Sequence, residues 1–537
     1  MNRRFPQLTL RSVIIGVLGL LVITSSSMYV ALRMGALPWP TVFVTIVSLA
    51  ILRRWKDSTL QEINITHTIM SSGAMVAGGL AFTIPGLWMN DPEATISVPS
   101  LLIITISGAL LGTLFSIVAR KKYVEKEKLP FPMGQAAYQT LMSATEKKKG
   151  ARLLFAAMGL SIVFTILRDQ FAIVPAALLL FSGSTLVAPL SMWLSPMAAG
   201  IGAIIGPSLA LFWLGGALVS YLVITPVGIS VGWFDSLAQA DVFRSNLGIG
   251  LMVGTGLAII VRFAVQGISS FRNNRKAAKE PSILFSKNIR YISLSLMAIV
   301  VILLSVTSTV PFFAALLLIA GIYITSQIAA MLTGQTGINP MEILGILVLL
   351  FVQLLADITI VQGFSIAAVT AIACGLSGDL MNDTKSGHLL GTNPSTQIFA
   401  EGVGGVIGAV VAVVALLVLK DSFGGFGTEA LPAPQARAVS AMVGGLSHVP
   451  AFTIGLVIGL ILYLCRLPSA TLGLGVYLPF SISSIMGFGS LVFLFFSMVS
   501  PKSKKESLKE RTSLLASGFL GGEGITGVVL AILFMLS

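Results

Sequence analysis

Charged side chains are scarce in this sequence, and their scarcity argues against a soluble fold. Only 10% of the 537 residues are Asp, Glu, Lys or Arg, whereas 55% are hydrophobic. Soluble domains carry about 25% charged residues. Apolar runs near 20 residues long recur from residue 12 to the C-terminus, and each could cross a bilayer as a helix. The sequence therefore predicts an all-α, polytopic integral membrane protein.

Reactive residues and catalytic motifs are equally sparse. The chain has two cysteines, too few for a disulfide framework, and three histidines. It contains no HExxH motif, no P-loop and no Cys/His cluster. ATP hydrolysis and metalloprotease chemistry are therefore not expected. We expect neither a cofactor nor a resident metal ion.

The net charge of +13 lies in short clusters between the apolar runs. This placement is typical of the cytoplasmic loops of membrane proteins and does not predict a nucleic-acid partner. Residues 1–11 are basic, and the apolar run after them is long enough for a first span rather than a cleaved signal peptide. The sequence predicts a multi-pass protein of the cell (plasma) membrane with a cytoplasmic N-terminus.

The chain aligns with itself, which indicates a gene duplication. At an offset of 302 residues, Leu129–Ala136 (LPFPMGQA) meets Leu431–Ala438 (LPAPQARA). The offset then falls to about 272, so that Leu247–Ile259 meets Leu520–Ile532. Internal similarity that keeps its register over a long stretch predicts two structural repeats.

Loop charges predict that the two repeats have opposite orientations. Residues 120–152 carry nine Lys or Arg and three Glu, whereas the equivalent residues 422–454 carry one Arg and one Glu. Because basic loops stay in the cytoplasm, equivalent loops fall on opposite sides of the membrane. We predict a first repeat over residues 1–270, a basic cytoplasmic loop and linker helix over 271–308, and a second repeat over 309–537. Two inverted repeats of this kind would hold roughly 14–17 transmembrane or re-entrant helices.

One polar stretch, Gly378–Gly391 (GDLMNDTKSGHLLG), lies between two long apolar runs. The repeat alignment places it inside a span or a broken helix, in which glycines would let the helix unwind. A charge at the bilayer centre costs about 2.5–3.5 kcal/mol, so such charges face protein or water and mark function. The alternative is a short cytoplasmic hairpin with ordinary surface charges. The candidates in this stretch for substrate binding or proton coupling are Asp379, Asn382, Asp383, Lys385 and His388.

Other polar residues outside this stretch receive separate predictions. Glu62 and Asn64, in the equivalent segment of the first repeat, either line a cavity or cap a helix that packs through small residues. Glu523 lies among glycines in GGEGITG and is a candidate buried proton site. Glu401 is expected at the end of a span, and Arg168–Asp169 is expected to be an ion pair at the membrane interface.

Segments spread over nearly the whole chain resemble the oligopeptide transporter family, which includes the yellow stripe-like metal-chelate carriers. Two of them are residues 62–87 (EINITHTIMSSGAMVAGGLAFTIPGL) and 378–397 (GDLMNDTKSGHLLGTNPSTQ). The resemblance implies a secondary carrier, of prokaryotic type, that imports peptides or metal–chelator complexes with protons. It adds Gln397 to the candidate residues.

The family motifs match this chain with two departures. The family's ENN segment corresponds to Glu62, Ile63 and Asn64, so one Asn is missing. Its PFPEG motif corresponds to residues 130–134, where Met133 replaces the usual Glu. These departures leave the substrate and the stoichiometry of coupling open. The family pattern GDxMxDxKxGxxLGxxPxxQ matches Asp379, Asp383, Lys385, Gly387, Gly391, Pro394 and Gln397.

The sequence supports one function and leaves alternatives. The first is a proton-coupled symporter, in which two repeats rock around a cavity lined by residues 62–68 and 379–385. Lys385 beside the aspartates would offer both signs of charge to a zwitterion. The alternatives are an intramembrane enzyme that acts on a lipid-linked substrate through Asp379 and Asp383, and a passive channel. The expected partners are a peptide or other small molecule, protons and the lipid bilayer, and GxxxG pairs also allow a homodimer.

Overall fold

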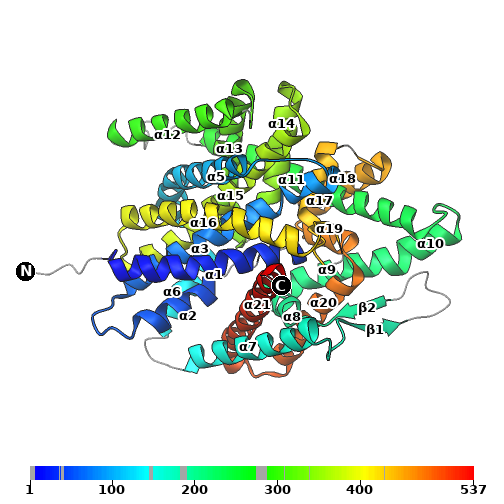
Figure 1. The fold of residues 1–537 in the computed structure, drawn as a ribbon, viewed down its shortest axis with the longest axis horizontal. Helices are drawn as coiled ribbons and strands as arrows, with labels where there is room; N and C mark the ends of the chain where they lie inside the picture. Colours follow the sequence, from blue (N-terminus) through cyan, green and yellow to red (C-terminus); the bar gives the residue numbers. More distant parts are fainter. Residues whose placement is uncertain are drawn as a thin grey trace, which may run out of the picture.

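Helices account for almost all of the computed structural model (Figure 1), because a chain in lipid must pair its backbone polar groups within each segment. Within the described residues, eleven helices are long and apolar enough to cross a membrane. They become twelve if Pro434–Gly444 (α17) and Val449–Leu464 (α18), bent by 118°, form one broken span. The prediction of an all-α polytopic membrane protein is confirmed. The structure describes residues 7–35, 37, 41–143, 149–181, 190–273, 287–307, 309–337, 339–428, 430–444 and 446–536.

The first half of the chain alternates long helices with short ones. Short π-helical turns extend three of the helices: η1 (Arg120–Lys126), η2 (Ile166–Gln170) and η3 (Ser220–Ile224). The α-helices of this half are α1 (Leu10–Met34), α2 (Thr41–Leu52), α3 (Leu60–Ala81), α4 (Pro85–Asn90), α5 (Val98–Ala119), α6 (Pro132–Ser143), α7 (Lys149–Thr165), α8 (Pro196–Ile205), α9 (Pro207–Val219), α10 (Thr225–Ser230) and α11 (Leu237–Asn273).

The predicted linker region contains one helix, α12 (Lys287–Val306), which lies at the periphery of the bundle (Figure 1); its role as a linker between two repeats stays a prediction. A short 3-10 turn, η5 (Lys502–Lys504), precedes the last helix. The remaining helices of the second half are α13 (Phe312–Thr336), α14 (Met341–Leu355), α15 (Ile360–Leu390), α16 (Pro394–Ser422), α19 (Ser469–Tyr477), α20 (Phe480–Val499) and α21 (Lys505–Leu536).

A two-stranded antiparallel ribbon interrupts the helices. It pairs β1 (Ala177–Phe181) with β2 (Leu190–Trp193), and every side chain of β1 is exposed. The sequence analysis assigned no strand here, because a short apolar run such as ALLLF has no periodicity that separates a strand from a helix. In Figure 1 the ribbon lies at the edge of the molecule, below α9 and α10.

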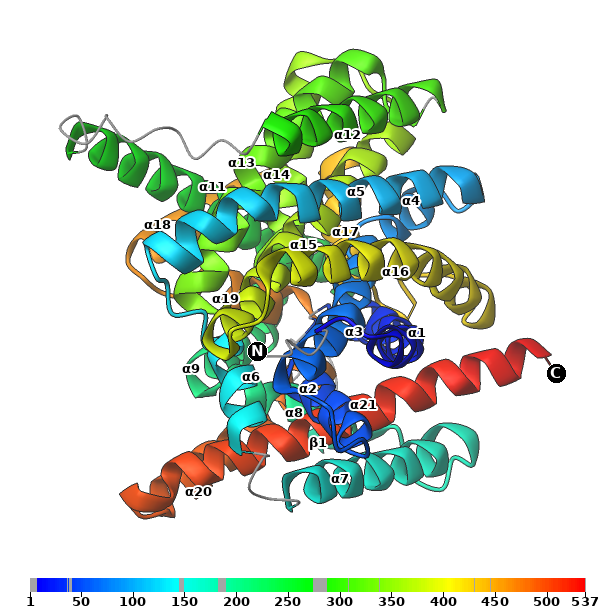
Figure 2. The ribbon, with the colours of Figure 1, turned by 90° about the vertical axis from the view of Figure 1, so that its left-hand side faces the viewer.

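Four helices form the centre of the bundle: α3, α5, α15 and α16. Figure 2 places α15 and α16 between α5 and α3, and all four are in mutual contact. Every residue of α3 from Glu62 to Ala81 is buried, as is every residue of α15 from Gly363 to Gly387. Most polar side chains within these two ranges are therefore shielded from solvent.

Glycines bring several helices into backbone contact. A Cβ atom on Gly408 of α16 would collide with the backbone of Gly73 of α3, and one on Gly202 of α8 would collide with the Met486 carbonyl of α20. The GxxxG pairs at these positions therefore pack helices of the same chain, as small residues do in membranes. A homodimer through GxxxG contacts stays a prediction.

Candidate functional site: a buried carboxylate cluster

Three buried carboxylates converge at the centre of the bundle. Asp379 and Asp383 lie one turn apart on α15 and so share one face. Glu401 comes from α16, which folds back along α15 after a short turn. Oxygen atoms of the three lie within 4.8 Å of one another, and none of the three side chains is exposed. We call these residues the carboxylate cluster.

The carboxylate cluster has few hydrogen-bond donors around it. The Ser71 hydroxyl of α3 donates to Oδ2 of Asp383 at 3.1 Å. Among the described residues, no donor reaches either oxygen of Asp379, either oxygen of Glu401, or Oδ1 of Asp383. His67, also on α3, places Nε2 3.8 Å from Oδ1 of Asp383, and neither of its ring nitrogens has a hydrogen-bond partner in the part of the chain that is described. Buried polar atoms without partners are rare in proteins, so this group of them needs a reason.

Electrostatics disfavour the simultaneous ionisation of all three carboxylates in the cluster. No lysine or arginine of the described chain forms an ion pair with Asp379, Asp383 or Glu401. Two like charges about 5 Å apart repel by roughly 3 kcal/mol at an effective dielectric constant near 20. Three ionised carboxylates would thus be strongly destabilising. Bound protons or a metal ion would relieve the repulsion.

A layer of neutral polar side chains adjoins the carboxylate cluster. Asn64 Oδ1 of α3 accepts a hydrogen bond from Ser386 of α15 at 2.8 Å. Gln397 of α16 donates to the Thr68 hydroxyl at 3.1 Å and to the Asp383 carbonyl at 2.7 Å. These bonds tie α3, α15 and α16 together. The structure thus brings two predicted residues, Asn64 and Gln397, next to the two aspartates.

Lys385 and Asn382 face a different neighbour. Lys385 Nζ donates to the Leu129 carbonyl at 2.9 Å, and Asn382 Oδ1 accepts from the Gly134 amide at 3.3 Å. Both contacts join α15 to the segment that carries the PFPMG motif. Lys385, expected beside the aspartates, forms no ion pair with them, because its long side chain reaches a backbone carbonyl instead. His388 is also apart from the cluster, since it is exposed at the end of α15.

The predicted break in the polar stretch is absent, because α15 runs without interruption from Ile360 to Leu390. Thr359 caps its start, and Gly391, with φ of 72°, ends it in the left-handed conformation that glycine adopts readily. Gly375 and Gly378 stay helical and serve packing: a Cβ on Gly378 would meet the side chain of Asn339. The alternative of a surface hairpin is equally excluded, since Asp379 and Asp383 are fully buried.

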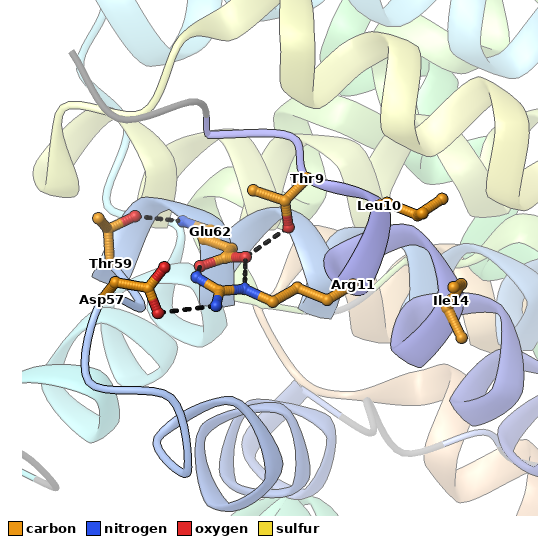
Figure 3. Close-up of a pocket in the computed structure, with 7 residues that line it drawn as sticks. All are labelled: Thr9, Leu10, Arg11, Ile14, Asp57, Thr59 and Glu62. Atoms are coloured by element: carbon orange, nitrogen blue, oxygen red, sulfur yellow. Dashed lines mark hydrogen bonds and ion pairs between the residues drawn. The ribbon is translucent and has the colours of Figure 1, made fainter. Parts of the chain in front are cut away.

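Glu62 lies at the start of α3, in an ionic contact of its own (Figure 3). Arg11 donates to both of its carboxylate oxygens, at 2.6 and 2.9 Å, and Thr9 donates to one of them. Arg11 also pairs with Asp57 at 2.8 Å, and this keeps the pKa of the Asp57 carboxyl below its usual range. The group lines a cavity of about 430 Å³. Glu62 therefore joins the starts of α1 and α3 and is not part of the carboxylate cluster.

Glu523 of α21 has a full set of partners. Arg168 donates to it at 2.9 Å, and it also accepts from the Ser195 hydroxyl and the Met197 amide. Arg168 pairs with Asp169 at 2.6 Å as well, but its side chain is 0% exposed. The predicted Arg168–Asp169 ion pair is present, and the Arg168 guanidinium also donates to the Leu194 carbonyl at 2.6 Å, so its contacts extend beyond Asp169. A carboxylate this well satisfied ties helices together and is a weak candidate for proton release.

Sequence reasoning missed two residues of the site, Glu401 and His67. It placed Glu401 at the end of a span, whereas the side chain is fully buried against Asp379. A usable signal was present: Asp379 and Glu401 each lie eleven residues from Leu390, and two helices that fold back at that point would bring them together. His67 lies on a helix distant in sequence, and only the packing of α3 on α15 reveals its position.

Comparisons with known proteins identify the family of the chain. The chain matches the family described as OPT oligopeptide transporter protein over residues 7–534. It is also 24% identical to a Haemophilus influenzae protein named "Putative oligopeptide transporter". That alignment covers 95% of this chain and 93% of the relative. The similarity therefore extends over both halves of the chain.

Proposed function

The chain belongs to the oligopeptide transporter family, and on that premise we propose that it is a secondary active carrier that takes up small oligopeptides, or related zwitterionic metal chelates, with protons. Family membership makes it a transporter rather than an enzyme. The name of the Haemophilus influenzae relative supports a peptide as the substrate. The coupling to protons rests on the carboxylate cluster.

The depth of the carboxylate cluster supports a role in coupling. Ser71, which contacts the cluster, is eleven residues from the start of α3. At 1.5 Å per residue this is roughly 16 Å along the helix, about half of a hydrocarbon core of about 30 Å. Ionisable residues at such depth are costly and characteristically form proton relays or substrate paths. Protons that neutralise the cluster on one side and leave on the other would couple transport to the gradient.

Helix contacts support two repeats in opposite orientation. The helices α3 and α15 are equivalent at the offset of 302, and so are α5 and α16. Asn64 of α3 contacts Ser386 of α15, and Ser71, further along α3, contacts Asp383, which comes earlier on α15. The two helices therefore run antiparallel. Equivalent helices that pack antiparallel are expected of inverted repeats. We propose that these repeats rock around the central four helices in alternating access.

Charges at the helix ends support a cytoplasmic N-terminus. Arg11, at the start of α1, lies beside the start of α3, and Gln61 of α3 donates to the Leu390 carbonyl at the end of α15. The basic turn η1 lies beside the same end of the molecule, since the segment after it binds Lys385. The opposite loop, residues 82–97, has two acidic residues and no Lys or Arg. The basic end is the one that cell membranes keep in the cytoplasm.

Cysteine labelling tests the membrane orientation. Lys126 and Thr428 are 302 positions apart and both are exposed. In a background with Cys374→Ala and Cys465→Ala, an impermeant maleimide applied to intact cells should label Thr428→Cys at once. It should label Lys126→Cys only after permeabilisation. Labelling of both positions from the same side would contradict the inverted arrangement.

Uptake into proteoliposomes tests the proposed function. With an acidic exterior, purified protein should accumulate a labelled short peptide above its external concentration, because protons entering with the peptide supply the energy. A protonophore should abolish the accumulation while leaving equilibration intact. Empty liposomes serve as the control, and a parallel assay with an iron chelate separates the two substrate classes. Uptake that never exceeds equilibration, or does not saturate, would indicate a channel instead.

A further inference from the structure

We propose that Asp379, Asp383, Glu401 and His67 form a binding site for one divalent metal ion. The sequence analysis expected no resident metal, because no metal-binding motif is present in the chain. The site shares residues with the proposed transport cycle but does not rest on it, since binding of an ion needs neither a peptide nor a gradient.

The first observation is the geometry of the carboxylate cluster. Oxygens from two helices, α15 and α16, approach one another within 4.8 Å in a fully buried place. Five of the six carboxylate oxygens have no hydrogen-bond donor in the described structure. Carboxylate oxygens that lie close together and accept no hydrogen bonds have lone pairs available to coordinate a cation. A buried divalent ion would also cancel most of the repulsion among the three charges.

The second observation is His67, which comes from a third helix. Its side chain is 0% exposed, and Nε2 lies 3.8 Å from Oδ1 of Asp383. Neither ring nitrogen has a partner within the described residues. A buried imidazole without hydrogen bonds is costly. As a neutral ligand of a metal ion held by the carboxylates, it would gain a partner for the nitrogen that faces them.

The donor types narrow the kind of ion. Carboxylate oxygens suit Mg²⁺, Ca²⁺ and Mn²⁺, whereas an imidazole suits transition metals and is unusual for Ca²⁺ or Mg²⁺. Three carboxylates with one imidazole therefore favour a first-row transition ion such as Mn²⁺. The three converging carboxylates include no sulfur donor, which also disfavours soft ions.

Metal binding to the purified full-length protein tests the site. After treatment with a chelator, the protein in detergent should bind one Mn²⁺ per chain, measured as loss of the free-ion resonance in electron paramagnetic resonance. Spin-echo modulation of the bound Mn²⁺ should reveal a coordinated nitrogen. Ca²⁺ and Na⁺ added in excess should compete poorly.

Matched variants assign the ligands. Glu401→Gln should weaken Mn²⁺ binding by about 100-fold, and His67→Gln should weaken it by about 10-fold and remove the nitrogen modulation. Asp421→Asn, on the same helix as Glu401 but exposed, should bind as the unmodified protein does. If Glu401→Gln fails to fold, Glu401→Asp takes its place. This variant keeps the charge and should lose less of the affinity for Mn²⁺. The proposal would be overturned if the unmodified protein failed to bind Mn²⁺ stoichiometrically, or if both Glu401 variants bound Mn²⁺ as tightly as the unmodified protein.

Discussion

Glu401→Gln is expected to abolish gradient-driven peptide uptake, lowering the initial rate by about 100-fold, the equivalent of about 2.7 kcal/mol in a barrier. Its carboxylate lies within 4.8 Å of those of both aspartates of α15 and accepts no hydrogen bond in the described structure. Its neutralisation removes one of three charges that would bind coupling protons. The substitution keeps the shape of the side chain, so folding and insertion should be preserved.

The assay compares initial uptake in proteoliposomes that contain equal amounts of protein. Asp421→Asn makes the same change of charge at the exposed end of α16 and should keep the full rate. Exchange of labelled for unlabelled peptide without a gradient offers a second readout. Loss of the coupling proton should spare this exchange, whereas a distorted substrate site would reduce it. Full gradient-driven uptake by Glu401→Gln would remove this residue from the coupling mechanism.

Arg168→Leu should destabilise the protein by about 3–5 kcal/mol, because it leaves the Glu523 carboxylate buried without its cation. Neither side chain of this pair is exposed. Removal of one partner from a buried pair costs more than removal of both. The double variant Arg168→Leu with Glu523→Gln should therefore recover much of the lost stability.

Unfolding in a series of detergent mixtures containing dodecyl sulfate gives the measurement. Trp193 provides a probe, since the Arg168 guanidinium lies 5.3 Å from the centre of its ring. The dodecyl sulfate content at which half of the protein is unfolded should fall for Arg168→Leu. It should return part of the way to the original value for the double variant. Asp241→Asn is the control, because Asp241 pairs with Arg244 in a partly exposed place. A double variant no more stable than Arg168→Leu would show that Glu523 is not what the arginine stabilises.

Much of the fold could be predicted from hydropathy and charge. Apolar runs predicted the spanning helices, and α12 lies within the range 271–308 in which one helix was expected. The polar stretch was correctly assigned to the interior of a helix, because the equivalent segment of the first half is apolar and rich in small residues. These features depend on composition over long windows, which one sequence records well.

The partners of individual polar residues could not be predicted. Lys385 binds a carbonyl before the PFPMG motif, and His67 approaches Asp383 across more than 300 residues of chain. The glycines of α15 suggested an unwound helix, whereas Gly378 is required for close contact with Asn339. In each case the sequence reveals the residue type, while the neighbour depends on how helices cross.

The unbroken course of α15 has a consequence for how this carrier can diversify. In an unbroken helix each interior peptide oxygen already accepts a hydrogen bond from its own helix, so recognition of an ion there depends mainly on side chains. Sites made of main-chain oxygens resist mutation, since every residue supplies the same atom. Here a single codon change at 379, 383 or 401 would replace an ion ligand outright. Relatives that share this scaffold could therefore acquire new ion preferences without any change in the path of the chain.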